Sequence, residues 1–307
     1  MTRYISARLL VTLPVVFGVS LAVFSMLFLI PGDPVKMMLS EFQTNPEQIA
    51  RMRAQLHLND PFAIQYGRFV LNAVHGDLGE SIRDRRPVTG EILEVLPSTV
   101  QLAVAALAFS SGLGISLGII AAVRQNSWID LASMMVALVG ISMPSFWLGL
   151  LLIFIFSLHL GWLPAAGGGG LDHLPLPALA LGMGAAAIIA RLTRSSMLEV
   201  LRMEYMTTAR AKGLANLGVV LRHGLKNALI PIITIFGLQF GSLLAGTVII
   251  ETVFGRPGIG QLLVNAILNK DFPLVQGVVL FVAVGYVMIN LAVDVIYAAV
   301  DPRIRYG

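Results

Sequence analysis

The 307-residue sequence contains no cysteine and few charged residues. The absence of cysteine excludes disulfides, thiol chemistry and thiolate metal sites. Asp, Glu, Lys and Arg make up only 12% of the residues, whereas 56% are hydrophobic, and the mean hydropathy is +0.82. Because apolar runs of about 20 residues match the hydrocarbon thickness of a bilayer, this composition indicates an integral membrane protein.

The sequence also lacks the motifs of common catalytic and energy-converting sites. No Gly-Lys dipeptide occurs, which excludes a phosphate-binding loop of the usual pattern, so we expect no ATP hydrolysis by this chain itself. The five histidines never adopt a close metal-binding spacing, and no apolar run holds a pair of carboxylates, so no metal or catalytic residue is expected. Ionisable groups are nearly absent from the apolar runs, which disfavours a proton-coupled transporter.

Six apolar runs predict an all-α protein with six transmembrane helices. Two Gly-x-x-x-Gly patterns, beginning at Gly114 and Gly237, are typical of faces where membrane helices pack closely. The predicted spans are residues 9–30, 98–123, 131–158, 176–190, 229–253 and 274–300.

Lysine and arginine set the expected orientation. With a cytoplasmic N-terminus, the short outside loops hold only Arg256 and Lys270, and most other basic residues fall inside. Residues 31–97 carry further charges but form a segment long enough to be translocated regardless of them. Both termini and the polar segment 196–228 are therefore predicted to be cytoplasmic.

The polar segment between the fourth and fifth spans predicts two short helices. Ser196 and Glu199 have the spacing of a capping box, Gly213 can supply a left-handed turn, and Asn216 offers a second N-cap. The apolar face expected on the second helix consists of Leu217, Val220, Leu221 and Leu225. Because energy has to come from a partner, this segment is the candidate lever for a soluble ATPase. Its basic residues fit an amphipathic helix lying on anionic lipid equally well.

The outside segment is expected to be folded. Asn45-Pro46 and Asp60-Pro61 each give a helix start signal, and an apolar stripe follows the second. These two helices either pack on the membrane surface or form a docking surface for an outside partner. The charged residues 83–86 are either a solvated face or a contact for an acidic partner.

Residues 204–213 (EYMTTARAKG), followed by 228–231 (ALIP), resemble the EAA loop of ABC-importer permeases. Further blocks along the chain resemble the first permease subunit of the dipeptide and oligopeptide branch. They are residues 31–34 (PGDP), 76–81 (GDLGES), 96–99 (LPST), 142–147 (SMPSFW), 160–164 (LGWLP), 251–260 (ETVFGRPGIG), 271–277 (DFPLVQG) and 301–306 (DPRIRY).

This resemblance implies a type I importer fold and a set of partners. They are a second, similar permease, two ATPase subunits that bind ATP and Mg²⁺, and an extracytoplasmic binding protein, without nucleic acid. The implied organisation is a first transmembrane helix (1–30), an outside scoop (31–97), a type I core (98–300) with a coupling loop (196–228), and a cytoplasmic tail (301–307).

Three groups of site residues follow from the residues and the resemblance. The residues expected to couple to the ATPases are Glu204, Tyr205, Thr208, Ala209, Arg210, Ala211, Lys212, Gly213 and Pro231. Those expected to meet the binding protein are Asn45, Tyr66, Asp77, Arg83, Arg85 and Arg86. The polar residues within spans that either line the path or make buried interhelical hydrogen bonds are Gln101, Ser142, Gln239 and Ser242.

The expected function is the import of peptides, such as dipeptides, oligopeptides or glutathione, across the cell inner membrane. Importers of nickel chelates and other small solutes share the same permease pattern and remain an alternative. A membrane scaffold without transport activity is the alternative from another class.

Overall fold

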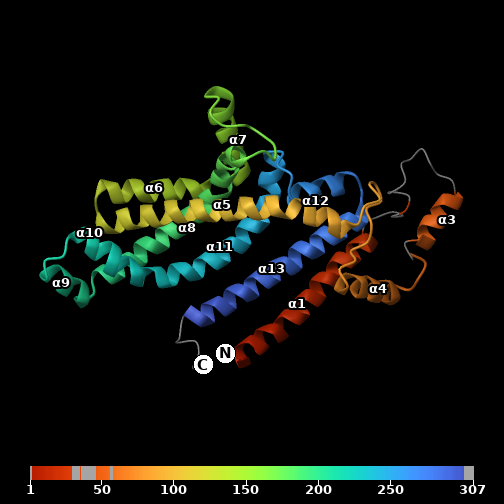
Figure 1. Cartoon of the computed structure of the whole chain (residues 1–307), viewed down its shortest axis with the longest axis horizontal. Coiled ribbons are helices and arrows are strands. Elements are labelled where there is room, and N and C mark those ends of the chain that lie inside the picture. Colours follow the sequence, from red (N-terminus) through yellow and green to blue (C-terminus); the bar gives the residue numbers. More distant parts are fainter. Residues whose placement is uncertain (1, 30–34, 36–45, 56–57, 301–307) are drawn as a thin grey trace. The chain divides into compact units, whose positions relative to one another are not determined.

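The computed structural model describes residues 2–29, 35, 46–55 and 58–300, and these residues form helices joined by short turns (Figure 1). Within this part of the chain the only bridge of β type is an isolated one between Glu80 and Pro87. The all-α class predicted from composition is therefore confirmed.

The elements in chain order are α1 (Thr2–Leu29), α3 (Pro46–Gln55), α4 (Phe62–Val74), α5 (Val88–Val123), α6 (Trp128–Ser142), α7 (Ser145–Leu152), the π-helix η1 (Ile153–His159), the 3-10 helix η2 (Leu171–His173), α8 (Pro175–Leu201), α9 (Glu204–Ala211), α10 (Asn216–Gly218), the π-helix η3 (Val219–Gly224), α11 (Leu225–Val253), α12 (Ile259–Leu268) and α13 (Phe272–Val300).

Among the described residues, four helical segments are long and apolar enough to cross a membrane: Val88–Val123, Leu171–Leu201, Pro231–Val253 and Phe272–Val293. The helices at Trp128–Ser142 and Ser145–His159 add a fifth span if they are counted as one bent pair, and α1 contributes the apolar stretch Leu10–Met26. These segments correspond to the six apolar runs of the sequence.

Three predicted boundaries were wrong. The run 131–158 bends by 106° at its centre, because Pro144 lacks an amide hydrogen and forces Met143 into an extended conformation. α5 begins at Val88 rather than Ser98 and accommodates Pro97 in its interior. α8 continues beyond Ala190 to Leu201.

The chain divides into two compact units, each with its own core. Unit one comprises Met1–Pro97 and Gly258–Leu291, and unit two comprises Ser98–Pro257 and Ala292–Gly307. The buried core of unit one contains Val88, Ile92, Ile259, Ala266, Leu274 and Val278.

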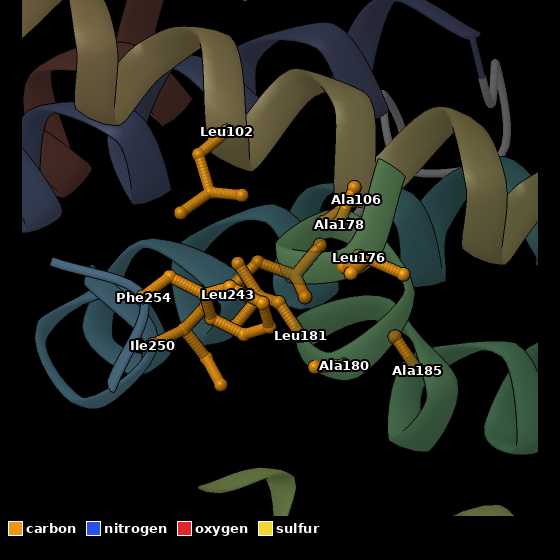
Figure 2. Close-up of a cluster of buried hydrophobic side chains, with 10 residues drawn as sticks. All are labelled: Leu102, Ala106, Leu176, Ala178, Ala180, Leu181, Ala185, Leu243, Ile250 and Phe254. Atoms are coloured by element: carbon orange, nitrogen blue, oxygen red, sulfur yellow. The ribbon is translucent and has the colours of Figure 1, made fainter. Parts of the chain in front are cut away.

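The main core of unit two gathers around α8. Figure 2 shows Leu181 of α8 beside Leu243 and Ile250 of α11, with Leu102 and Ala106 contributed by α5. All of these side chains are buried, so α8 is covered on several sides by apolar contacts.

Glycines bring α5 into direct contact with α8. A Cβ atom added at Gly114 would lie 2.6 Å from the carbonyl oxygen of Ala186, and one at Gly118 would lie 2.5 Å from Cβ of Thr193. A Cβ at Gly237 would likewise collide with Val293. The predicted packing role of the Gly114 and Gly237 motifs is confirmed, because small residues allow such close helix approach.

The Gly118 contact leads to a stability prediction. Gly118→Val should lower the melting temperature of the purified protein in detergent, because overpacking against a fixed backbone costs about 1–3 kcal/mol. Gly112→Val on the same helix is the matched control, since no atom lies within 4 Å of its Cβ position. Equal melting temperatures for the two variants would contradict the packing assignment.

Candidate functional site on helices α9, α10 and η3

The candidate site begins with α9, a short polar helix that follows α8. Met203 is the extended residue before its first turn, and Met206 and Ala209 are its buried residues. The remaining residues of α9 are exposed: Glu204, Tyr205, Thr207, Thr208, Arg210 and Ala211. One face of α9 is therefore fixed to the protein while the other is open to a partner.

Gly213 ends this helix through its backbone conformation. Its φ angle is +78°, in the left-handed region that favours glycine, and its amide donates to the carbonyl of Arg210. No atom lies within 4 Å of its Cβ position, so glycine is needed here for the sign of φ rather than for space. The predicted left-handed turn is confirmed.

The predicted helix starts around the site were wrong. Ser196 lies inside α8 and is buried, because Met197 and Val200 continue the packed face of that helix. Asn216 is the first residue of α10 and follows the capping position at Ala215. Packing of the last turns of α8 therefore outweighs the local capping signal.

The predicted apolar face of the second helix was half right, since Val220 is buried and Leu225 packs against the same core, but Leu221 is exposed. The buried residues are Val219, Val220 and Gly224, whereas Leu217 is 71% exposed. The reason is the π-helix η3, since its wider turn rotates the buried face away from the spacing of 3.6 residues that the prediction used.

A common buried core joins α9 to the membrane helices on either side. It contains Ala122 of α5, Met197 and Val200 of α8, Met206 and Ala209 of α9, Val219 and Val220 of η3, and Ala228 of α11. α9 therefore shares one close-packed core with α5, α8, η3 and α11.

A hydrogen bond links the exposed face of α9 to α11. Asn227 donates from Nδ2 to the hydroxyl of Tyr205 at 2.7 Å. The role of Asn227 was missed from the sequence, because nothing in the local pattern pairs two residues that are 22 positions apart. Pro231, also predicted to take part in coupling, lies inside α11 and is exposed.

Asp130 and Arg194 form a bidentate ion pair that ties α6 to α8. Arg194 donates from Nε and Nη2 to the two carboxylate oxygens of Asp130, each at 2.7 Å. Asp130 also accepts from the amide of Asn126, and Ser127 caps α6. Sequence reasoning missed this pair, although Ser127-x-x-Asp130 resembles a helix-start signal.

The predicted docking residues of the outside segment fall in unit one, apart from Asn45, which lies outside the described residues. Tyr66 faces α1, where its hydroxyl lies 2.8 Å from Oγ of Ser20 and its ring packs against Phe24. Asp77 accepts from the amide of Gly79 in a local turn.

The three predicted docking arginines differ in their surroundings. Arg83 donates from Nε and Nη2 to the carbonyl of Asn269, and Arg86 pairs with Glu94 at 2.6 Å. The carboxylate of Glu94 raises the pKa of Arg86. Arg85 is exposed and has a positive φ of 55°.

Buried Asp271 organises the turn that carries these arginines. It accepts a hydrogen bond from the hydroxyl of Ser81 at 2.6 Å and one from the amide of Arg83 at 3.4 Å. The turn is thereby fixed to the start of α13, which presents Arg85 on a rigid surface.

The four candidate path residues lie on three helices of unit two. Gln101 on α5 and Ser242 on α11 are exposed. Ser142 on α6 is exposed too, but its hydroxyl donates to the carbonyl of Leu138. Gln239 on α11 is buried, and its Nε2 has no hydrogen-bond partner among the described residues.

Comparison with known proteins identifies the family. The family model "Binding-protein-dependent transport system inner membrane component" matches residues 114–306, and its companion N-terminal model matches residues 1–103. The chain belongs to this family of transport permeases. It is therefore a multi-pass membrane component of a binding-protein-dependent transport system.

Two relatives match over their full length. The chain is 44% identical to the dipeptide transport system permease protein DppB of Alkalihalophilus pseudofirmus. It is 45% identical to the glutathione transport system permease protein GsiC of Escherichia coli. In both comparisons the alignment covers 100% of this chain and 100% of the relative.

Solved structures show the same fold at low sequence identity. An inward-facing structure of the MetNI methionine ABC transporter matches with a TM-score of 0.57 and 19% identity, covering 68% of this chain and 96% of the other. An amino acid ABC transporter crystallised with histidines matches with a TM-score of 0.53 and 15% identity, covering 69% and 94%. The fold of the core is that of ABC importer permeases.

The Asp130–Arg194 pair leads to a second stability prediction. Arg194→Gln should lower the melting temperature in detergent, because it leaves the buried carboxylate of Asp130 without its ionic partner, at a cost of at most about 3 kcal/mol for this partly buried pair. The exchange Asp130→Arg with Arg194→Asp should recover part of that loss. Arg191→Gln is the control, since Arg191 is exposed on the same helix. A melting temperature for Arg194→Gln equal to that of Arg191→Gln would rule out a structural role for the pair.

Proposed function

We propose that this chain is the permease subunit of an ATP-driven importer that carries peptides across the cytoplasmic membrane. The full-length similarity to a dipeptide permease and to a glutathione permease supports this cargo class. Nickel chelates and other small solutes are the alternative cargo for the same fold.

The proposed complex contains four kinds of subunit. This chain pairs with a second, similar permease, two ATPase subunits bind the face that carries α9, and an extracytoplasmic binding protein delivers substrate. ATP and Mg²⁺ are held by the ATPases, and this chain has no enzymatic role. Both termini and α9 lie in the cytoplasm, which agrees with the distribution of Lys and Arg.

One observation carries the proposal: α9 is exposed on one face and packed into a common core with α5, α8 and α11 on the other. A soluble partner that moves α9 would therefore move the membrane helices with it. In this scheme ATP binding draws the two α9 helices of a permease pair together, the spans rock, and cargo passes between the subunits.

On the outside face, Arg85 and its neighbours are proposed to contact the binding protein. The hydrogen bonds of Ser81 and Arg83 with Asp271 support this, since they hold the turn in a defined conformation. A rigid turn that presents a cation suits the recognition of a carboxylate on a partner.

The coupling role of α9 predicts that Gly213→Val lowers peptide uptake at least about tenfold. The variant should still reach the membrane. A β-branched residue is strongly disfavoured at a φ of +78°, so the turn after α9 has to change. Uptake and ATPase activity are measured together on the reconstituted complex, and ATP hydrolysis should no longer respond to substrate.

Gly218→Val is the matched control for this experiment. Gly218 is exposed within the same surface, has a φ of −65°, and has no atom within 4 Å of its Cβ position. Wild-type uptake by Gly213→Val would show that α9 is not the coupling element.

Recovery of the complex separates transport from the scaffold alternative. A tagged chain purified from its native membrane should carry two ATPases and a second permease. A chain that is recovered alone and binds anionic vesicles in a salt-sensitive manner would instead support the scaffold.

A further inference from the structure

Arg256 is a buried cation with unused hydrogen-bond donors. It follows α11 in unit two and is only 3% exposed. The positive φ of 54° at Gly255 turns the chain, and the amide of Arg256 donates to the carbonyl of Glu251 at 2.9 Å. Its Nε and Nη1 atoms are buried and have no hydrogen-bond partner in the part of the chain that the structure describes.

Such an arrangement is costly for a folded protein. Each buried donor without a partner destabilises the folded state, and more so when the group is charged. Burial lowers the pKa of Arg256, an effect that the negative charge of nearby Glu251 opposes, and a guanidinium still stays protonated in proteins. A cation kept in this state is suited to binding an anion from outside the chain.

The carboxylate of Glu251 offsets the positive charge of Arg256 but accepts no hydrogen bond from its Nε or Nη1 atom. Glu251 is fully buried, and its carboxylate accepts a hydrogen bond from the hydroxyl of Thr99 at 2.7 Å. The local environment is therefore electrically balanced, and the free Nε and Nη1 atoms of Arg256 are left for a further acceptor.

Gln101 is an exposed residue of α5 whose side chain contacts the guanidinium of Arg256. Its Oε1 lies 3.4 Å from Nη2 of Arg256, which is longer than an ordinary N–H···O hydrogen bond, and Gln101 itself is exposed. A carboxylate forms shorter bonds to guanidinium, roughly twice as strong as those of a neutral acceptor. The side chain of Gln101 is thus a weak acceptor that a carboxylate can displace.

The position of Arg256 within unit two places it far from α9. α11 begins next to η3 and runs for 29 residues, or about 44 Å, before Arg256 is reached. Figure 1 shows the same arrangement, with α9 and α10 at one end of α11 and the turn after α11 at the other. If α9 is cytoplasmic, Arg256 lies at the outer end, where a delivered substrate enters.

We propose that Arg256 binds the terminal carboxylate of the incoming peptide, with Gln101 as its displaceable cover. The inference rests on the proposed function, since it assigns a recognition site for that peptide cargo. Arg256 is then a specificity-determining residue at the entrance to the path. It selects substrates that carry a free carboxylate.

The test measures uptake by the complete complex reconstituted with its binding protein. The probes are alanylalanine and its C-terminal amide, each supplied at saturating concentration and each compared with its own wild-type rate. Arg256→Gln should lower uptake of alanylalanine at least about tenfold and leave uptake of the amide unchanged. Arg124→Gln, an exposed arginine in the turn after α5 that belongs to none of the proposed contacts, is the control and should change neither rate.

Two variants of Gln101 test the site with alanylalanine as the only substrate. Gln101→Glu places a carboxylate beside Arg256 and should lower alanylalanine uptake to a similar extent, whereas Gln101→Met, of similar size and uncharged, should not.

Two outcomes overturn the inference. One is an equal effect on acid and amide uptake in Arg256→Gln, which would mean that the arginine does not recognise the free carboxylate of the peptide. The other is equal behaviour of Gln101→Glu and Gln101→Met. A wild-type complex that takes up neither these dipeptides nor glutathione nor a longer peptide would refute the proposed function itself, which separates that failure from failure of the arginine site.

Discussion

The close contact of α5 with α8 is the interaction on which unit two depends. At Gly114 and Gly118 the two helices approach so closely that no side chain fits between them. In lipid, apolar burial gives little drive for helices to associate, so van der Waals packing of this kind stabilises the bundle. Asp130 and Arg194 add α6 to the same assembly. α8 is thus fixed along most of its length.

The short helix α9 is packed beside α8, which contacts α5 and α6. α9 follows α8 after a short connection, and its Met206 and Ala209 share a core with residues of α5, α8 and α11. A polar helix that only rested on lipid would not need this buried packing. The chain returns from α9 to α11 through the left-handed turn at Gly213 and the π-helix η3.

Arginine side chains at the two ends of unit two differ in how their hydrogen-bond donors are used. In the charged pair of Asp130 and Arg194, two nitrogens of the guanidinium each donate to a different oxygen of the carboxylate. Beyond the other end of α11, Arg256 keeps free donors beside a weak acceptor. A completed pair stabilises a fixed structure, whereas an incomplete one leaves free energy available for binding. This contrast separates a structural ion pair from a candidate recognition site.

The sequence by itself determined the helical class, the apolar runs and the turn at Gly213, because these follow from local composition and backbone chemistry. The family also followed from the order of its motifs. Only the tertiary structure decided the pairs Asp130 with Arg194 and Arg256 with Gln101, whose members are 64 and 155 residues apart. It also overruled the capping signal at Ser196, since the burial of Met197 and Val200 stabilises a continuous helix more than a local cap would.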